Sequence, residues 1–398
     1  MPHLPWPLIL GSTLIDAVIA YFTLFVRLDR EAPANRTRAI GVGRVSLAIL
    51  TTSAGFVIKL LVLKRFGVDL FGWIHLAYLD LVILVPVIGG FLLLSRMTQA
   101  GPGLTPLVRI AATVSLVLPL VGIYATWIEP FRLRLESATL FVSAAREGIA
   151  PLRIGVLTDL QTDRVSDHER RAVALLMSQK PDLILLPGDV FQGTGEQFEA
   201  TRSGLRDLLG SLSAPGGVYL VLGDTDGSGD HLREILRSTE IRVLENEIAR
   251  GSVGDRKFAI GGVELAHSSE PPQHVIDRLE ETGDEAEIRI LLAHRPDVAL
   301  GLRPGSRIDL VVAGHTHGGQ IVVPWFGPLM TLSQVPRSVA AGGLHRISGN
   351  PVYVSRGVGA ERAQAPRIRF LCAPEVSVIE LRSGPPDSID SKLTPRGR

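Results

Sequence analysis

Four long apolar stretches fill the first third of the chain. They cover residues 7–27, 40–63, 71–95 and 106–128 and consist mainly of Leu, Ile, Val, Ala and Gly. Each is long enough to cross a hydrocarbon core of about 30 Å as a helix. The pattern therefore predicts a membrane domain over residues 1–128, with four transmembrane helices and the lipid bilayer as its partner.

The pattern changes after Glu129-Pro130. Residues 131–142 alternate between apolar and polar side chains, which predicts one or two strands. Further strands are predicted at 153–158, 182–187, 218–222, 289–293 and 310–313, with helices at 167–179 and 196–212. Apolar strands that alternate with helices are typical of a sheet buried on both faces. We therefore predict an α/β domain over residues 129–382, followed by a disordered polar tail over residues 383–398.

Ionisable residues are rare within the four apolar stretches. The first stretch contains Asp16, and the third contains His75 and Asp80. We expect single acidic residues on otherwise apolar helices to face the interior of the bundle in a structural role. The stretches show neither paired charges nor the broken-helix pattern of a substrate path, which disfavours a transporter.

Basic residues near the helix ends bear on orientation. The segment before the first stretch has no Lys or Arg, whereas the first loop contains Arg27, Arg30, Arg36 and Arg38. This asymmetry favours an α/β domain outside the cytoplasm. Lys64, Arg65, Arg132 and Arg134 follow later stretches and argue the other way, so the side of the membrane stays open with a slight preference for the extracytoplasmic side.

Charge and cysteine content narrow the choice of partners. The chain has 41 Lys and Arg against 40 Asp and Glu, a net charge of +1. Such a balance argues against a nucleic-acid partner attracted by bulk charge. Cys372 is the single cysteine of the sequence, so no disulfide forms within it, and we expect a small buried hydrophobe there.

Polar side chains follow five of the predicted strands at the points where those strands end. In residues 309–320 an apolar run stops at Gly314 and is followed by His315 and His317. Because ligands in such sheets collect at the carboxyl ends of the strands, we expect these side chains to converge. The full set is Asp159, Gln161, Asp189, Asp224, His294, His315 and His317.

Oxygen and nitrogen donors without a thiolate favour divalent Mn, Fe or Zn over a structural zinc of the cysteine type. The seven donors exceed what one tetrahedral ion takes. Two ions about 3.5 to 4 Å apart that share a carboxylate would use them all, and such a pair activates water and clamps phosphoryl oxygens. The sequence therefore predicts a two-metal site for phosphoryl chemistry.

These motifs resemble those of the calcineurin-like metallophosphoesterases, in particular their membrane-anchored bacterial branch. The resemblance covers about residues 130–382, and its most specific piece is Gly314-His-Thr-His-Gly-Gly-Gln320. It implies a four-layer α/β/β/α sandwich, a metal centre between two sheets and a location in a bacterial inner membrane. By position, Asp159, Gln161, Asp189 and His317 would hold the first metal, and Asp189, Asp224, His294 and His315 the second, with Asp189 as the bridge.

Two motifs depart from the family's usual pattern. Gln161 stands where the family usually has a histidine, which weakens the first metal site without excluding it. Asp224 replaces an asparagine, and its added negative charge should lower the Lewis acidity of the second metal. Thr225 replaces the histidine that, in the family, steadies the transition state or protonates the leaving oxygen.

A threonine hydroxyl cannot carry positive charge near neutral pH. General acid help is worth roughly 10² to 10⁴ in rate, so we expect activated diesters or pyrophosphate linkages to be preferred over alkyl monoesters. His231 is a candidate replacement for the missing imidazole, with an ordinary surface histidine as the alternative. Arg356 is a candidate contact for a substrate phosphate, with a structural ion pair as the alternative.

These observations favour a membrane-anchored, metal-dependent hydrolase of a phosphoester or pyrophosphate that is lipid-linked or close to the membrane. A water or hydroxide that bridges the metals would be the nucleophile. The alternative is a weak or inactive member of the family that serves as a membrane sensor or scaffold. Retention of Asp159, Asp189 and the three histidine ligands favours the enzyme.

Overall fold

In the computed structural model, the described residues are 4–25, 40–97, 104–143, 150–227, 229–266, 268–281, 284–384 and 389–390. The chain divides into two compact units. Met1–Trp127 and Glu361–Arg367 form the helical unit, and Ile128–Ala360 and Ile368–Arg398 form the sheet unit. The arginines of the first loop and most of the predicted tail lie outside the described residues.

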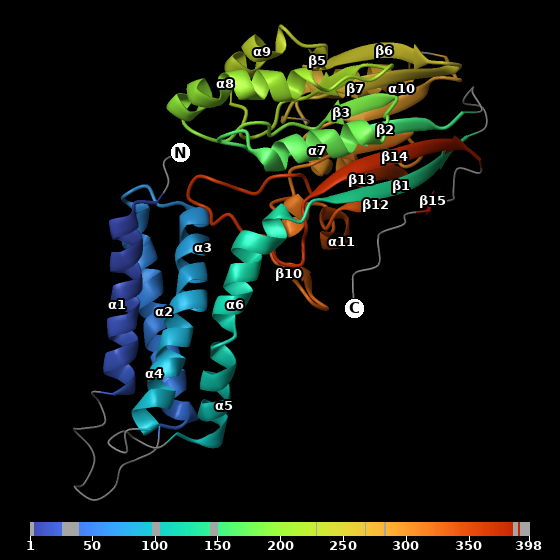
Figure 1. Cartoon of the computed structure of the whole chain (residues 1–398). Coiled ribbons are helices and arrows are strands. Elements are labelled where there is room, and N and C mark those ends of the chain that lie inside the picture. The colour runs from blue at the N-terminus through green and yellow to red at the C-terminus, as the bar shows by residue number, and fades with distance from the viewer. Residues whose placement is uncertain are drawn as a thin grey trace, which may run out of the picture. The chain divides into compact units, whose positions relative to one another are not determined.

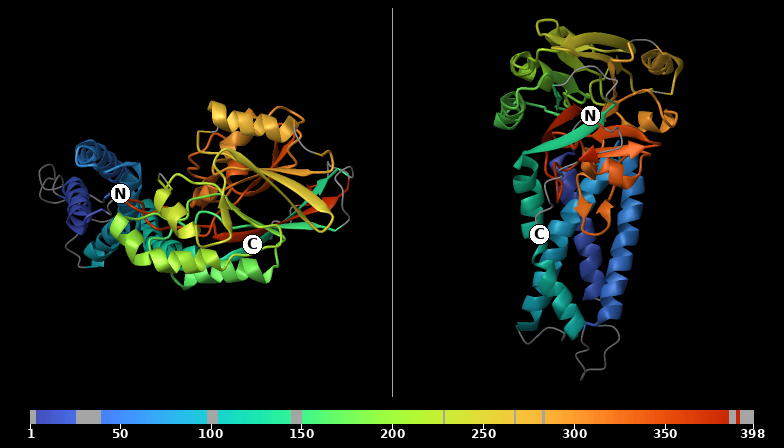
Figure 2. Two further views of the ribbon diagram at one scale, coloured as in Figure 1. Left: turned by 90° about the horizontal axis from the view of Figure 1, so that it is seen from above. Right: turned by 90° about the vertical axis from the view of Figure 1, so that its right-hand side faces the viewer.

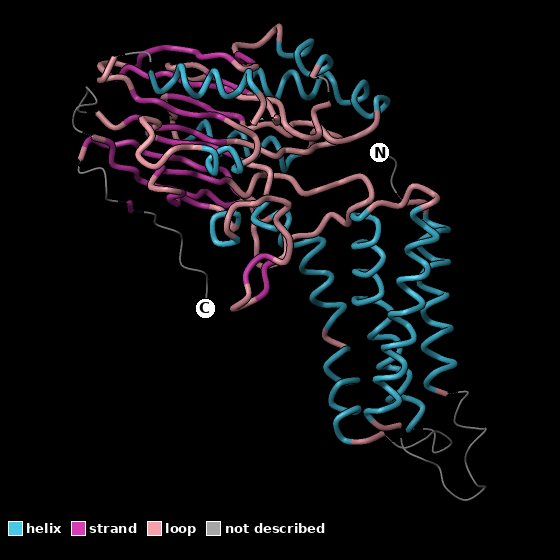
Figure 3. Tube along the Cα trace, turned by 180° about the vertical axis from the view of Figure 1, so that it is seen from behind, coloured by secondary structure: helices cyan, strands magenta, loops and turns pink. Residues whose placement is uncertain are grey.

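The described residues include four helices that are long and apolar enough to cross a membrane, and these helices make up most of the helical unit (Figures 1 and 3). They cover Trp6–Leu24, Val42–Lys64, Leu70–Leu94 and Pro106–Phe131, which confirms the four predicted helices. The elements of these segments are α1 (Trp6–Leu24), α2 (Val42–Lys64), α3 (Leu70–Leu79), η2 (Asp80–Leu84), α4 (Val85–Met97), α5 (Pro106–Ser115), α6 (Leu118–Ile123), η3 (Tyr124–Ile128) and η4 (Glu129–Phe131). The last residue of η3 and all of η4 belong to the sheet unit.

A buried ion pair links the first two helices. The ammonium group of Lys59 on α2 contacts the carboxylate of Asp16 on α1, and the two side chains are 8% and 0% exposed. It also donates to the carbonyl oxygen of Ser12 at 3.4 Å. Asp16 therefore faces the bundle as expected, but the expectation that the spans lack paired charges is wrong. Its counter-charge lies 43 residues away on another helix, where sequence spacing does not reveal it.

Residues Glu361–Arg367 belong to the helical unit although they follow strands of the sheet unit. The side chain of Gln364 accepts a hydrogen bond from the N–H of Asp69 at 3.0 Å and donates to the carbonyl oxygen of Gly67 at 2.8 Å. The segment thus satisfies backbone groups at the start of α3. The predicted boundaries after residues 128 and 382 did not include this return, and they stay predictions.

The sheet unit contains two large mixed sheets and a short hairpin. The first sheet has β1 (Arg134–Val142), β2 (Leu152–Val156), β3 (Leu183–Leu186), β4 (Val218–Leu220), β5 (Ile241–Val243), β14 (Glu375–Ser383) and β15 (Ile389–Asp390), in the order β15-β1-β14-β2-β3-β4-β5. The second has β6 (Glu247–Val253), β7 (Arg256–Gly262), β8 (Ile288–Leu292), β9 (Leu310–Ala313), β12 (Gly343–Ile347) and β13 (Asn350–Val354), in the order β12-β13-β9-β8-β7-β6. The hairpin pairs β10 (Val322–Val323) with β11 (Gly327–Pro328).

Helices cover the outer faces of the two sheets, as the left view of Figure 2 shows. They are α7 (Asp167–Ser178), α8 (Gly195–Gly210) and α9 (Asp230–Leu236) on the first sheet, and α10 (Glu270–Glu281) and α11 (Arg337–Ala340) on the second, with the short turns η5 (Pro296–Gly301) and η6 (His317–Gly319) in the connections. This arrangement confirms the four-layer α/β/β/α sandwich.

The strand β3 shows why its sequence is a continuous apolar run. Leu183 and Leu185 pack in the core between the sheets, together with Phe258 of the second sheet. Ile184 and Leu186 point to the opposite face, where they pack among residues of the covering helices. Because both faces of the strand are buried, no polar alternation remains.

We predict that the Lys59–Asp16 pair stabilises the helical unit. Lys59→Met leaves a buried carboxylate without its counter-charge, which should destabilise the protein by about 3 to 5 kcal/mol. Thermal unfolding of the full chain in detergent measures the effect, with Lys64→Met in the exposed last turn of the same helix as the control. Combining Lys59→Met with Asp16→Leu should recover most of the loss; equal unfolding temperatures for Lys59→Met and Lys64→Met would contradict the prediction.

Candidate metal centre

The predicted ligands lie on loops that follow five strands. β2, β3 and β4 are parallel neighbours in the first sheet, and β8 and β9 are parallel neighbours in the second. Their carboxyl ends therefore lie at one edge of each sheet. Asp159 and Gln161 follow β2, Asp189 follows β3, Asp224 follows β4, His294 follows β8, and His315 and His317 follow β9.

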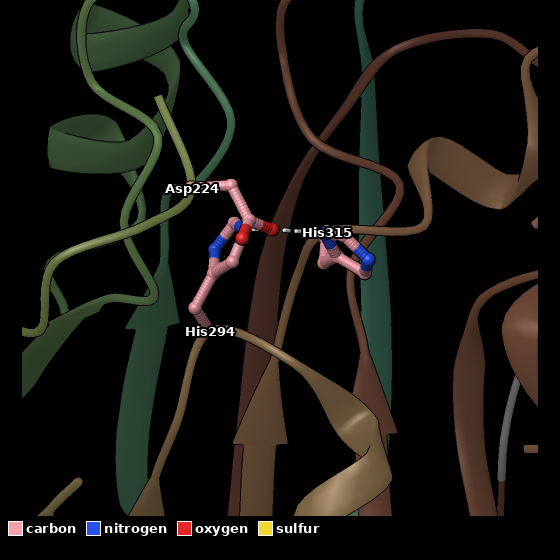
Figure 4. Close-up of side chains that lie close together, drawn as sticks. All are labelled: Asp224, His294 and His315. Atoms are coloured by element: carbon pink, nitrogen blue, oxygen red, sulfur yellow. Dashed lines mark ion pairs between the residues drawn. The ribbon is translucent and has the colours of Figure 1, made fainter. Parts of the chain in front are cut away.

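Two overlapping groups of donor atoms form at this edge. One consists of Asp224, His294 and His315, and the other of Asp159, Asp189 and His294. Within each group, one ligand atom per residue lies within 4.8 Å of the others. Figure 4 shows the first group converging from separate loops. This first group belongs to the second metal site that the family resemblance implies. The other group combines Asp159 and Asp189, ligands of the implied first site, with His294.

The remaining two predicted ligands adjoin these groups. Nε2 of His317 lies 3.6 Å from a carboxylate oxygen of Asp159. The side-chain amide of Gln161 donates to Asp189 at 3.1 Å. A metal ligand needs the amide oxygen instead, so Gln161 must turn its amide group over to serve as one. All seven predicted ligands therefore lie in or beside one cluster.

The backbone around the ligands is unusual. Asp159, Gln161, Asp189, His315 and His317 have φ values of 49°, 39°, 54°, 70° and 48°. Such left-handed conformations are uncommon for non-glycine residues and are maintained only where surrounding structure fixes them. Strain of this kind, concentrated at the predicted ligands, is typical of a functional site.

Glycines at two strand ends allow the close approach. A Cβ atom on Gly223 would collide with the carboxylate of Asp189, and one on Gly314 would collide with the carboxylate of Asp159. These glycines let a carboxylate from one loop lie against the backbone of the next. The Gly-Asp and Gly-His motifs thus have a steric cause.

Backbone carbonyl groups orient two of the imidazoles. Nδ1 of His294 lies 2.6 Å from the carbonyl oxygen of Pro187, and Nε2 of His315 lies 3.1 Å from that of Leu332. Each carbonyl accepts a hydrogen bond from one ring N–H, so the other nitrogen faces the carboxylates. Nε2 of His294 and Nδ1 of His315 lie 3.3 and 2.8 Å from Asp224. This arrangement fixes the ring nitrogens as it does in histidine metal ligands.

The cluster concentrates negative charge. Burial raises the pKa of Asp159 to about 7, and the charge of Asp189 acts in the same direction. Burial would lower the pKa of His294, but the surrounding carboxylates, Asp189 first, raise it to about 10. For Asp224, burial would raise the pKa of the carboxyl group, but hydrogen bonds from its histidine and arginine neighbours hold that pKa well below its usual range. The cluster therefore stabilises positive charge, which a divalent cation supplies.

His317 tests whether the donors fit a metal ion. Burial, aided by the charge of Arg369, holds the pKa of His317 well below its ordinary value. The ring is therefore neutral, and among the described residues neither of its nitrogens has a hydrogen-bond partner. Buried polar groups are rarely left in this state. A neutral imidazole beside a carboxylate provides a lone pair for a metal, so the residues fit divalent ions.

Asp226 ties two of the ligand loops together. Its carboxylate accepts hydrogen bonds from the N–H groups of Asp189 and Val190, both at 2.9 Å, and of Gly223 at 2.8 Å. The N–H of Thr225 in turn donates to Asp189 at 2.8 Å. The sequence analysis gave Asp226 no role, because its partners are backbone groups of a different loop. The Thr225 hydroxyl is buried, with no hydrogen-bond partner among the described residues.

Arg295 is a site residue that the sequence analysis missed. Its guanidinium group contacts both carboxylate oxygens of Asp224, with Nε at 3.1 Å from one of them. The side chain is 42% exposed, so the charged group also borders solvent. Its positive charge offsets the extra negative charge of Asp224 relative to an asparagine. The sequence feature that could have indicated Arg295 is its position directly after His294, at the end of a predicted strand.

The other two candidate catalytic residues lie in different surroundings. Arg356 pairs with Glu375 and, through Nη2 at 2.5 Å, with Glu136, which is the structural alternative considered from the sequence. His231 is exposed on α9, and its ring lies 5.1 Å from that of Phe198. Neither residue belongs to the two donor groups.

A four-layer sandwich with carboxylate and imidazole donors at its strand ends defines the metallophosphoesterase class. Residues 152–319 match the family model described as calcineurin-like phosphoesterase. The chain is 33% identical over 270 residues to the phosphodiesterase YaeI of Escherichia coli (strain K12), a match that covers 64% of this chain and 88% of that protein. The chain therefore belongs to the calcineurin-like phosphoesterase family, which confirms the resemblance.

Two other comparisons give more distant matches. The metallophosphoesterase YkuE of Bacillus subtilis (strain 168) is 28% identical over 269 residues, which cover 65% of this chain and 89% of that protein. The structure of the NAD nucleotidase NadN of Haemophilus influenzae aligns with a TM-score of 0.38 and 16% identity, over 52% of this chain and 45% of that one.

We predict that the histidines after β9 hold different ions. His315→Ala and His317→Ala should each lower the number of tightly bound Mn²⁺ ions by one, because the ligand sets implied by the family resemblance assign each histidine to a different metal. Metal analysis after equilibrium dialysis of the full chain in detergent measures the number. His274→Ala, an exposed histidine on α10, is the matched control. Unchanged stoichiometry in both site variants would contradict the assignment.

Proposed function

We propose that this chain is a membrane-anchored, metal-dependent hydrolase of phosphodiesters or pyrophosphates, acting on a lipid-linked or membrane-proximal substrate. The observation that carries the proposal is the pair of donor groups that share His294. Carboxylates and imidazoles in this arrangement suit two divalent ions, which would activate water and neutralise phosphoryl oxygens. The name phosphodiesterase carried by the relative YaeI agrees with this reaction class.

The chain's own residues supply positioning and charge. Asp226 fixes the loops that carry Asp189 and Asp224, and the two backbone carbonyls fix the rings of His294 and His315. The guanidinium group of Arg295 offers a fixed positive charge that can pair with phosphoryl oxygens. Preorganised charge of this kind stabilises a transition state without reorganisation.

Proton transfer to the leaving group is the function that these residues do not provide. The Thr225 hydroxyl is not acidic, and pairing with Asp224 raises the pKa of Arg295 above its ordinary value, despite partial burial. A substrate with a good leaving group needs no such proton. The site therefore favours activated diesters and pyrophosphates over alkyl monoesters.

The expected substrate class rests on the membrane anchor. The fourth apolar helix ends at Phe131, and β1 begins at Arg134, so a very short connection tethers the sheet unit to the membrane segment. A tether of this length keeps the metal centre at high effective concentration relative to the lipid surface. A phosphate group carried on a lipid is therefore the favoured substrate.

Hydrolysis of bis(p-nitrophenyl) phosphate by the full chain in detergent tests the proposed reaction. We expect Mn-dependent turnover that Asp189→Asn lowers by at least about 10²-fold, because this carboxylate is the predicted bridge and electrostatic contributions of this size are usual at such sites. Arg303→Gln, which replaces an exposed guanidinium group that pairs with Glu280, should leave turnover unchanged.

Two results would overturn parts of this proposal. Absence of turnover with Mn²⁺ bound would favour a sensor or scaffold that keeps the metal-binding fold. Turnover of glycerol phosphate at a rate equal to that of the nitrophenyl diester would contradict the preference for good leaving groups.

We also predict that Arg295 contributes to phosphate recognition. Arg295→Gln should lower kcat/KM for the diester by about tenfold to hundredfold, since hydrogen bonds to charged groups are worth roughly 1.5 to 3 kcal/mol. Adding Asp224→Asn to Arg295→Gln separates two roles. If Arg295 only balances the charge of Asp224, the double variant regains activity; if it contacts the phosphate, the loss persists and orthophosphate inhibits both variants more weakly than the parent.

A further inference from the structure

The sheet unit presents a concentrated apolar surface directly after the last ligand motif. Residues 321–332 contain no charged side chain. Within this segment, Trp325 is 104% exposed, Phe326 58%, Leu332 54%, Leu329 49% and Met330 38%. We call this segment the apolar hairpin. Elsewhere in the described part of the sheet unit, the exposed large hydrophobic residues are Ile128, Phe131, Leu300 and Leu371.

Backbone pairing holds the apolar hairpin in a defined shape. Val322 and Val323 of β10 pair with Pro328 and Gly327 of β11, and the N–H of Leu329 donates to the carbonyl oxygen of Ile321 at 3.1 Å. The hairpin extends away from both large sheets (Figures 1 and 3). Trp325 lies in the turn between the two strands. A fixed turn therefore displays the largest apolar side chain of the segment.

This clustering needs an explanation. Single exposed hydrophobic residues are normal on soluble proteins, but contiguous apolar patches mark surfaces that bind proteins, membranes or ligands. The hairpin exposes five large apolar side chains within eight residues and has no charged residue among them, so it has the character of a binding surface.

The chemistry around the apolar hairpin fits a lipid surface. Tryptophan concentrates at the interface between headgroups and hydrocarbon, where its ring is buried and its N–H stays hydrated. Arg337 follows the hairpin and lies 4.7 Å over the ring of Phe326, and residues 321–336 contain no acidic side chain. An apolar tip beside a cation matches the layered chemistry of acyl chains under phosphate groups. The chain also has four helices that are long and apolar enough to cross a bilayer, so a lipid surface is the partner that the rest of the chain favours.

We propose that the apolar hairpin inserts into the interfacial layer of the bilayer that holds the helical unit, and so presents the metal centre to phosphate groups carried on lipids. A hydrogen bond joins the hairpin to the metal centre: the carbonyl oxygen of Leu332, at the end of the hairpin, lies 3.1 Å from Nε2 of His315. Insertion itself is independent of catalysis. Its consequence for lipid-linked substrates rests on the proposed function.

Fluorescence of Trp325 tests the insertion. The chain has four tryptophans, and replacing Trp6, Trp73 and Trp127 by Phe leaves Trp325 as the sole reporter. In vesicles of phosphatidylcholine and phosphatidylglycerol, we expect blue-shifted emission, quenching by lipids brominated near the headgroup and protection from aqueous acrylamide. The control moves the reporter to the exposed Leu300, as Leu300→Trp with Trp325→Phe, which should give the emission of a water-exposed tryptophan.

Each outcome of this measurement decides the proposal. Quenching by brominated lipid at Trp325 and not at the Leu300 reporter supports insertion. Blue-shifted emission without lipid quenching shows that protein, either the chain's own helices or a second copy, covers the hairpin, and it overturns the proposal. Emission of a water-exposed tryptophan at Trp325 overturns it as well.

A second measurement tests the consequence for substrates. Ethyl p-nitrophenyl phosphate and hexadecyl p-nitrophenyl phosphate share a leaving group, but only the second enters vesicles. Trp325→Ser with Phe326→Ser should lower turnover of the hexadecyl ester by about tenfold or more, because burial of one aromatic side chain corresponds to at least that factor. Turnover of the ethyl ester should stay unchanged.

The two proposals fail in distinguishable ways. If the parent protein hydrolyses neither ester but the lipid quenching is observed, the proposed function fails and insertion stands. If both esters are hydrolysed and the hairpin variant loses neither, the link between the hairpin and lipid-linked substrates is overturned while the proposed function stands.

Discussion

The repulsion among buried carboxylates is the constraint on which the metal centre depends. Asp159 and Asp189 are almost completely shielded from water, and Asp224 lies beside them. Anions this close are stable only when cations or hydrogen-bond donors balance them. His294 lies between them, and Arg295 pairs with the outermost carboxylate. The same negative field that raises the pKa of His294 attracts a divalent ion.

The surrounding fold maintains this unfavourable arrangement through its backbone. Left-handed φ values at five ligands, close contacts at Gly223 and Gly314, and the backbone hydrogen bonds of Asp226 all place side chains where local preferences would not. The core between the two sheets supplies the stability that permits such strain, because the strands that lead to the ligand loops bury their apolar side chains in it. The strands therefore position the donors, and the backbone strain lies in the loops that follow them.

The strand ends were predictable from the sequence because a few consecutive residues are enough to indicate each of them. An apolar run followed by Gly-Asp or Gly-His indicates both the end of a buried strand and a donor at that end. The parallel order of β2, β3 and β4 then brings the donors together. The four apolar helices were predictable for the same reason, since length and hydropathy are properties of a continuous segment.

The features that escaped prediction are pairings between distant segments. Lys59 stabilises Asp16 across two helices, Gln364 returns from the sheet unit to the start of α3, and Asp226 binds backbone groups of another loop. Arg295 differs, because it is adjacent to a ligand but has a partner 71 residues away. Its pairing with Asp224 also changes the meaning of the Asn-to-Asp departure. Without a partner, the Asp224 carboxylate would lower the Lewis acidity of the metal it binds. Paired with Arg295, the two side chains together have no net charge, as the neutral amide of asparagine would.

The apolar hairpin and the metal centre share one continuous stretch of chain, residues 315–332. His315 and His317 belong to the loop that leads into the hairpin, and the carbonyl oxygen of Leu332 at its far end orients the His315 ring. The backbone carbonyl that holds the His315 ring is separate from the exposed side chains of Trp325 and Phe326 at the turn. The base of the hairpin therefore supports the metal centre, and its tip is left to contact a lipid surface.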